Sequence, residues 1–414
     1  MLRLSIKDIR IYWFTFLINF VFWTIMAPAA IQSPDIYMML PIGFGLLIII
    51  IPLGNDIRDG RDILYAPYLR FKGNIYVCRA STVDHRILDI TRAGLTLKGL
   101  PATLGLRPQA MKMKFVTPET EGSFLRFTLN ANEILARAGK MSSGSADILH
   151  RAYIGETLSL IYLPLYVKAN TLYDAVSNKP IFTLPVKEDV IKPAIKKNPG
   201  WKLTFMPMLC PRCGWNLDGQ RDSVLMTCSN CDSAWEAAEG RFIPVKHKVV
   251  PGKSEESLYL PFWKITAGAR GVDIDSFADF IRITNQPRVL APDWEGEKMN
   301  FWCPAFKIRP KLFLRLARQF TVSQKRFEAG EGISGKRIFP VTLPRSEAVQ
   351  SMKVILAVST MHKKNVFPHL PRISFNVTDS ALVYLPFTER GSEILHEGMN
   401  ISINKNTLEY GRRL

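Results

Sequence analysis

Four cysteines in two close pairs constrain the fold of this chain more than any other feature of its sequence. Cys210 and Cys213 form the first pair, and Cys228 and Cys231 form the second, in the pattern C-x2-C-x14-C-x2-C. Two thiolates from each of two tight turns make a tetrahedral four-sulfur cage, which is a ligand set that suits Zn²⁺. The residues between the pairs include the turn "DGQ" and the strand-like "DSVLMT", which predict a hairpin.

The segment from Phe205 to Phe242 resembles a zinc ribbon of the four-cysteine class, in which knuckles such as "CPRCG" are typical. The resemblance implies a structural zinc ion but no particular activity, because such ribbons occur in transcription factors, helicases, ribosomal proteins and assembly factors. A rubredoxin-like site, with iron on the same four thiolates, is the alternative. Zinc is favoured because rubredoxin knuckles are usually separated by a longer loop. The other two cysteines, Cys78 and Cys303, lie in apolar stretches that predict buried, inert thiols.

Two apolar runs occupy the N-terminal part of the chain. The first, Ile11 to Ile31, has twenty-one residues without a charge, and the second, Ile36 to Leu53, follows after a four-residue link. At 1.5 Å per residue the runs would span roughly 27 to 32 Å, near the hydrocarbon thickness of a bilayer. They predict a transmembrane helical hairpin over residues 1–55. A signal peptide ending near "APAA" and a buried soluble hairpin are the other two interpretations.

The basic residues around these runs predict the orientation of the hairpin. They are Arg3, Lys7 and Arg10 before the first run, and Arg58, Arg61, Arg70 and Lys72 after the second, while the link has none. Because cytoplasmic loops carry an excess of Lys and Arg, both termini and the main body are expected in the cytoplasm, in a two-pass inner-membrane protein. Free thiolates survive in that compartment.

A short aromatic-proline phrase recurs along the rest of the chain. It occurs as YAPYLRFK from Tyr65, YLPLYVKA from Tyr162, YLPFWKIT from Tyr259, WCPAFKIR from Trp302 and YLPFTERG from Tyr384. Proline at the entry of an alternating run marks an edge or the first residue of a strand. Each phrase therefore predicts the start of a strand whose aromatic residues lie in a core. Chance recurrence in a β-rich sequence is the alternative.

These phrases divide the chain into modules of an α+β, β-rich class. We expect one or more β-rich modules over residues 56–200, the ribbon over 201–245, and an α+β module with the repeated strands over 255–414. The phrases and the ribbon together resemble bacterial membrane-anchored zinc-ribbon proteins that carry Tyr-Leu-Pro-Phe-Trp phrases. That resemblance implies no activity.

Two stretches have helical periodicity. "DSFADFIRITNQ" predicts a core helix, and Asp273 and Asp275 before it would cap the helix or coordinate a cation. "KLFLRLARQF" after Pro310 predicts a helix with a separate basic stripe formed by Lys311, Arg315 and Arg318. The stripe is either a solvated face or a face turned to anions or lipid.

The net charge of +18 predicts acidic partners, which include nucleic acid, anionic lipid and acidic protein surfaces. The ribbon itself does not carry this charge, because Leu209 to Ser233 has two basic residues and three acidic ones. Phosphate contacts supply most non-specific affinity for nucleic acid. Only weak binding of nucleic acid is therefore expected.

The sequence shows no pattern that predicts an enzyme. "GEGISGK" at Gly330 to Lys336 fits a phosphate-binding loop in spacing, but Arg337 stands where Ser or Thr should hold Mg²⁺, and no strand or helix flanks it as the motif requires. The six histidines are scattered, without H-E-x-x-H spacing.

These observations predict a non-catalytic, membrane-anchored zinc-ribbon protein that acts as a structural subunit or assembly scaffold of a membrane complex. Its expected partners are the lipid bilayer and other subunits of that complex. A nucleic-acid-binding ribbon protein and a rubredoxin-like electron-transfer subunit with iron are the two alternatives. The sequence identifies no small-molecule substrate.

Overall fold

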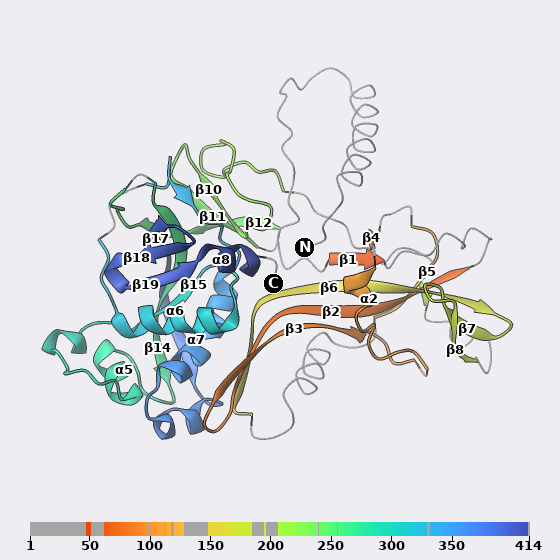
Figure 1. Cartoon of the computed structure of the whole chain (residues 1–414), viewed down its shortest axis with the longest axis horizontal. Helices are drawn as coiled ribbons and strands as arrows, with labels where there is room; N and C mark the ends of the chain where they lie inside the picture. The colour runs from red at the N-terminus through yellow and green to blue at the C-terminus, as the bar shows by residue number, and fades with distance from the viewer. Residues whose placement is uncertain are drawn as a thin grey trace, which may run out of the picture. The chain divides into compact units, whose positions relative to one another are not determined.

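The computed structural model describes residues 47–50, 62–97, 99–111, 113–116, 120–127, 148–183, 194–195, 206–238, 240–254, 256–328 and 332–412 (Figure 1). Within these ranges strands predominate and helices accompany them, which confirms the α+β, β-rich class. The described strands form sheets of nine, three and seven strands.

Two long antiparallel strands, β2 (Ile63–Cys78) and β6 (His150–Lys168), form the centre of the nine-stranded sheet. The strand order is β4-β1-β6-β2-β5-β9, with β3 beside β2, β7 beside β6 and β8 beside β7. The shorter strands are β1 (Leu47–Ile50), β3 (Val83–Ala93), β4 (Lys114–Phe115), β5 (Ser123–Leu125), β7 (Thr171–Asp174), β8 (Lys179–Thr183) and β9 (Ala194–Ile195). The short helix α2 (Arg107–Ala110) lies between β3 and β4 in the chain.

The seven-stranded sheet is built in the same way, on the antiparallel pair β14 (Leu258–Arg270) and β17 (Ser374–Arg390). Its order is β15-β14-β17-β18-β19, with β13 beside β17 and β16 beside β14. The other strands are β13 (His247–Val249), β15 (Asn300–Pro304), β16 (Arg337–Ile338), β18 (Glu393–His396) and β19 (Ile401–Asn404).

The aromatic-proline phrases pair with one another in both sheets. Each tyrosine lies opposite the proline of the partner phrase: Tyr65 with Pro164 and Tyr162 with Pro67 in the first sheet, and Tyr259 with Pro386 and Tyr384 with Pro261 in the second. The same register in two sheets supports duplicated modules over chance recurrence. The phrases lie at the start of β2 and β14. The prediction is wrong for β6 and β17, which begin at His150 and Ser374, and for β15, which ends at the proline of its phrase, Pro304.

Helices cover the second sheet. Helix α5 (Phe277–Thr284) is the predicted core helix, and its N-cap is Ser276 in a capping box with Asp279, not Asp273 or Asp275. Helix α6 (Pro310–Ser323) begins at the predicted proline and exposes the predicted stripe, Lys311, Arg315 and Arg318, to solvent. The other helices are α7 (Arg345–Ser359) and α8 (Lys405–Gly411), with 3-10 turns η1 (Pro292–Glu295), η2 (Lys363–Asn365), η3 (Phe367–His369) and η4 (Glu397–Met399).

The predicted transmembrane hairpin, residues 1–55, lies outside the described residues except for Leu47–Ile50. These four residues form β1, which pairs in parallel with Ser159–Tyr162 of β6 and antiparallel with β4. This part of the second apolar run is therefore a strand, which corrects the helix predicted there. Among the helices that the structure describes, none is long and apolar enough to cross a bilayer.

Candidate metal centre

The four cysteines lie at and just before a small three-stranded sheet, which comes between the two large sheets in sequence: Cys228 ends its first strand, Cys231 is in the following turn, and Cys210 and Cys213 precede the sheet. It consists of β10 (Leu225–Cys228), β11 (Ser233–Ala238) and β12 (Arg241–Val245), paired antiparallel in that order. The predicted hairpin between the cysteine pairs is present, because Asp218 and Thr227 exchange backbone hydrogen bonds of 2.7 and 2.9 Å.

Tight turns position the sulfur atoms. In the first knuckle the N–H of Gly214 donates to the carbonyl of Cys210 at 2.8 Å, and Gly214 has φ of +74°, which glycine adopts without steric cost. In the second knuckle Asp232, directly after Cys231, has φ of +50°. Each turn thus directs two thiols to the same point.

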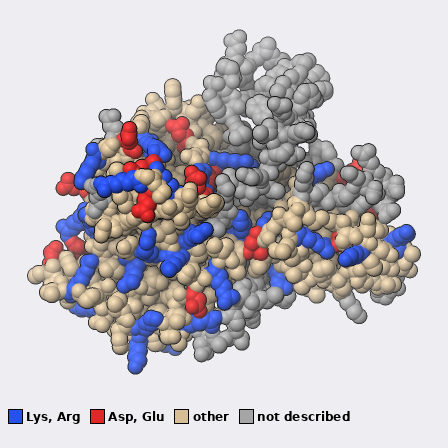
Figure 2. All heavy atoms as spheres, in the orientation of Figure 1, with Lys and Arg blue, Asp and Glu red and all other residues tan. Residues whose placement is uncertain are grey.

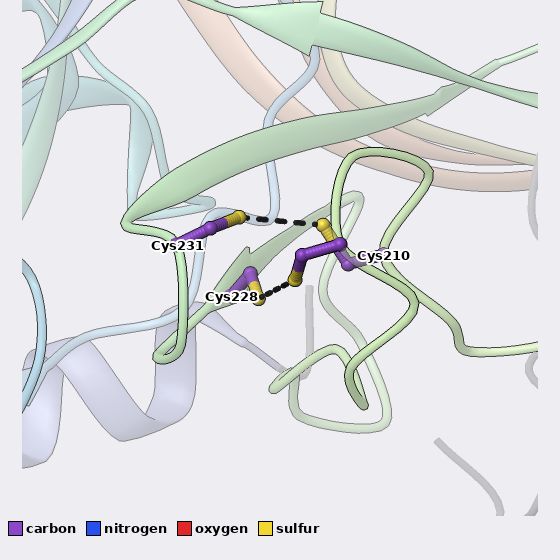
Figure 3. Close-up of side chains that lie close together, drawn as sticks. Cys210, Cys228 and Cys231 are labelled. Carbon is purple, nitrogen blue, oxygen red and sulfur yellow. Dashed lines mark hydrogen bonds between the residues drawn. The ribbon is translucent and has the colours of Figure 1, made fainter.

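All four Sγ atoms lie within 4.8 Å of one another, and Figure 3 shows the side chains of Cys210, Cys228 and Cys231 gathered at one point. The distance from Sγ of Cys210 to Sγ of Cys231 is 3.6 Å, and that from Cys213 to Cys228 is 3.5 Å. A tetrahedral zinc ion with Zn–S bonds of about 2.3 Å sets its sulfurs roughly 3.8 Å apart. The spacing therefore fits a four-thiolate metal site and is too long for disulfide bonds. It supports metal binding and does not distinguish zinc from iron.

The local environment favours ionisation of part of the cage. Burial raises the pKa of the Cys210 thiol, but hydrogen bonds from Ser233 and from backbone amides of the first knuckle outweigh this effect and lower its pKa to about 6. Hydrogen bonding, first from the Asn230 side chain, lowers the pKa of Cys213. Burial instead raises the pKa of Cys228 to about 12. The positive charge of a bound metal ion would oppose this effect of burial and favour the thiolate of Cys228.

Ser233 is hydrogen-bonded to two of the cysteine thiols, and the sequence did not predict this role. Its hydroxyl lies 3.0 Å from Sγ of Cys231 and 3.5 Å from Sγ of Cys210, and it accepts a 2.8 Å hydrogen bond from Nε1 of Trp235. Such outer partners fix ligand orientation. Its position in the sequence could have indicated this role, because Ser233 comes two residues after the last cysteine and two residues before a tryptophan.

The ribbon is tied to the second sheet and its loops. The N–H of Val224 donates to the carbonyl of Val341 at 2.8 Å, and that of Ile333 donates to Oδ1 of Asp232 at 2.7 Å. Arg412 forms a bidentate ion pair with Asp222, with one contact of 2.8 Å. Ile333 belongs to the "GEGISGK" stretch, so this loop contacts the metal knuckle. No phosphate site is assigned to it.

The other cysteines and the acidic residues that the sequence suggested as cation ligands lie outside the metal centre. Cys78 and Cys303 are buried as predicted, at 0% and 1% exposure, and burial raises the pKa of each thiol to about 12. Among the residues that the structure describes, one group of His, Cys, Asp or Glu side chains lies close enough together to hold a metal ion. That group is the four ribbon cysteines. Asp273 and Asp275 are outside it.

A buried charged cluster lies apart from the metal centre, where β6 meets α7 and the segment after β15. Glu347 is 3% exposed and accepts a hydrogen bond from the N–H of Gly155, which sits at a bulge in β6 with φ of +70°. Nζ of Lys307 donates to Oγ1 of Thr157 at 3.0 Å. Burial raises the pKa of Glu347 to about 7, although Lys307 lowers it.

Comparison with known proteins adds no assignment: no family model, no curated protein and no solved structure matches the chain. The likeness of residues 205–242 to a zinc ribbon thus rests on the cysteine spacing and the geometry of the sulfur cluster.

Proposed function

We propose that this protein is a non-catalytic, membrane-anchored zinc-ribbon protein that serves as a structural subunit or assembly scaffold of a membrane complex. The support is a metal cage with four protein thiolates, which leaves a tetrahedral ion no open position for substrate. A closed site of this kind contributes folding energy and rigidity. Zn²⁺ is the proposed metal.

The observation that carries the proposal is a pair of separately exposed apolar side chains at the first cysteine knuckle, of which Trp215 is the larger. Trp215 is 57% exposed and Leu209 is 48% exposed, and Leu209 is bridged to Asn216, next to Trp215. Tryptophan is enriched among the residues that dominate protein–protein binding. A metal-fixed knuckle presents it at low entropic cost. This surface suits another protein subunit better than it suits phosphates.

Replacement of Trp215 by serine tests the scaffold role. We expect tagged full-length protein from solubilised membranes to recover its co-purifying subunits at least fivefold less well, with metal content unchanged. Val289→Ser is the matched control, because Val289 is 92% exposed and lies after α5, outside the ribbon. Equal recovery by Trp215→Ser and the unaltered protein would argue against the proposal. Sub-micromolar, sequence-dependent nucleic-acid binding at physiological salt, lost in Cys213→Ser, would favour the nucleic-acid alternative.

The proposed anchor is the N-terminal apolar region, with both termini in the cytoplasm by the distribution of Lys and Arg. Pairing of Leu47–Ile50 in β1 leaves residues 36–46 of the second run, roughly 16 Å as a helix, which is too short to cross a bilayer. In this proposal the anchor therefore enters and leaves the membrane on the cytoplasmic side. A topology reporter fused after Leu414 is expected to be active in the cytoplasm. A reporter active only on the opposite side would mean that Ile11 to Ile31 spans alone and carries the body across.

A further inference from the structure

A cleft lies on one face of the seven-stranded sheet, beyond the end of α6. Lys264 and Thr266 on β14 lie opposite Trp302 and Asn300 on β15, so strand alternation places these four side chains on the same face. Phe320 of α6 packs on Trp302, with ring centroids 6.0 Å apart, and the helix ends three residues later. The sheet beyond the helix borders a cleft of about 480 Å³.

The cleft has positive charge in excess after its internal ion pairs are counted. Its two lining carboxylates already have cationic partners, because Glu297 pairs with Arg326, and Asp379 pairs with Lys246 at 2.7 Å. Three lining lysines form no ion pair in the part of the chain that the structure describes: Lys264, which Asp379 influences without a salt bridge, Lys298, and Lys325, whose Nζ donates to the carbonyl of Gly398. The site therefore offers ammonium groups to an anion from outside.

Lys264 is the most constrained of these lysines. It is half-buried on the central strand, and its Nζ lies 5.9 Å from the ring centroid of Trp302. Burial, and then the nearby Lys248, lower the pKa of Lys264, whereas Asp379 raises it. A bound anion would offset this cost of holding the charge away from water.

The polar groups around Lys264 are held in place by the chain itself. Oγ1 of Thr266 donates to Oδ1 of Asn300 at 2.8 Å, and Nε2 of Gln324 donates to the carbonyl of Thr321 at 2.8 Å. Gln324 ends α6 with φ of +46°, a left-handed conformation in which Gly or Asn is usual. Its side chain therefore fixes the turn that carries Lys325 into the cleft.

We infer that this cleft binds a small molecule through its phosphate group or groups, with Lys264 at the floor and Lys298 and Lys325 at the rim. Lysine binds phosphate as a point charge, and three lysines beside two carboxylates that already have salt-bridge partners match a multiply charged anion. The volume is within the range of small-molecule sites. The inference goes beyond the scaffold role and does not depend on it.

Titration calorimetry on the full-length protein in detergent tests the inference, with inorganic pyrophosphate as the probe at physiological salt. We expect one saturable site, an affinity at least tenfold weaker in Lys264→Met, and an affinity within twofold of the unaltered protein in Lys311→Met. Lys311 lies on the exposed face of α6 and is not a cleft residue, so it controls for the loss of one charge. Lys298→Met, at the exposed rim, gives a second test that does not disturb the sheet.

Soluble dihexanoyl phosphatidic acid distinguishes the source of the phosphate. Tighter binding of this lipid than of pyrophosphate, weakened by Lys264→Met, assigns a lipid headgroup, and the reverse order assigns a free phosphorylated metabolite. Absence of saturable binding with both probes would overturn the inference. So would an equal loss of affinity in Lys264→Met and Lys311→Met.

Discussion

Replacement of Cys213 by serine is expected to lower the metal affinity of the ribbon by at least about a hundredfold, since even an outer-shell partner contributes about 10- to 100-fold. The purified variant should carry far less than one equivalent of metal in elemental analysis. Cys78→Ala is the matched control, because it also removes one thiol but lies outside the sulfur cluster. The unaltered protein should be colourless and contain zinc. A red protein with iron would favour the electron-transfer alternative.

The same variant should unfold the ribbon while the second sheet stays folded. The ribbon's own core is small, with Met206, Leu217, Met226 and Ala237 buried beside two of the cysteines, and a core of this size needs a metal to be stable. Amide hydrogen exchange should lose protection in β10 and β11 and keep it in β14 and β17. Loss of protection in all four strands would show instead that the metal holds the second sheet as well.

Replacement of Lys307 by methionine is expected to reduce the free energy of unfolding by about 3 kcal/mol at pH 8, because it leaves the buried Glu347 without its counter-charge. The loss should be smaller at pH 5, where Glu347 is protonated. Urea denaturation of the detergent-solubilised protein at the two pH values measures both. Lys311→Met, on the exposed face of α6, should stay within about 0.5 kcal/mol of the unaltered protein.

The double variant Lys307→Met/Glu347→Gln separates the charge from the hydrogen bond. Glutamine keeps an acceptor for the N–H of Gly155, so the double variant should recover to within about 1 kcal/mol of the unaltered protein. A double variant as unstable as Lys307→Met alone would mean that the lysine acts through packing, not charge.

Glu347 also predicts how stability depends on pH. Its pKa is raised from 4.5 to about 7 in the folded protein, so the folded state binds the proton more tightly than the unfolded state between these values. Its contribution to stability therefore falls as the pH rises from about 4.5 to about 7. The neighbouring charges that act on it are Lys307 and Glu156, and Lys307 is in turn influenced by Lys72 and Asp222. Glu347→Gln should flatten the pH dependence in that window.

The sequence predicted correctly the features that depend on residues close together in the chain. The cysteine knuckles form a cage because a short spacing and a turn suffice to place Cys210 beside Cys213. Helix α6 begins at Pro310 because proline suits the first turn. The phrase at Tyr259 begins a strand, but its pairing with the phrase at Tyr384 is a long-range contact that no local pattern contains.

The unpredicted parts depend on partners far away in sequence. In the sequence alone, Lys307 resembles an ordinary surface lysine. Only the folded structure shows that β6 and α7 place Thr157 and Glu347 around it. The strand at Leu47–Ile50 reads as a membrane span, because an apolar run has the same composition in a sheet as in a bilayer. The cleft at Lys264 needs three strands and the end of a helix to be in register.

The strand pairing has a consequence for the order in which the chain folds during synthesis. The central pair of the first sheet closes only after residue 150 has been made, because Cys78 pairs with His150, and that of the second sheet must join Arg270 to Ser374. Such distant pairings form slowly, since loop-closure entropy must be overcome first. The metal ribbon has all four ligands between residues 210 and 231 and needs no distant strand to bind its ion. We therefore expect the metal knuckle to fold first on the growing chain, with β14 to β19 assembling beside it as they emerge.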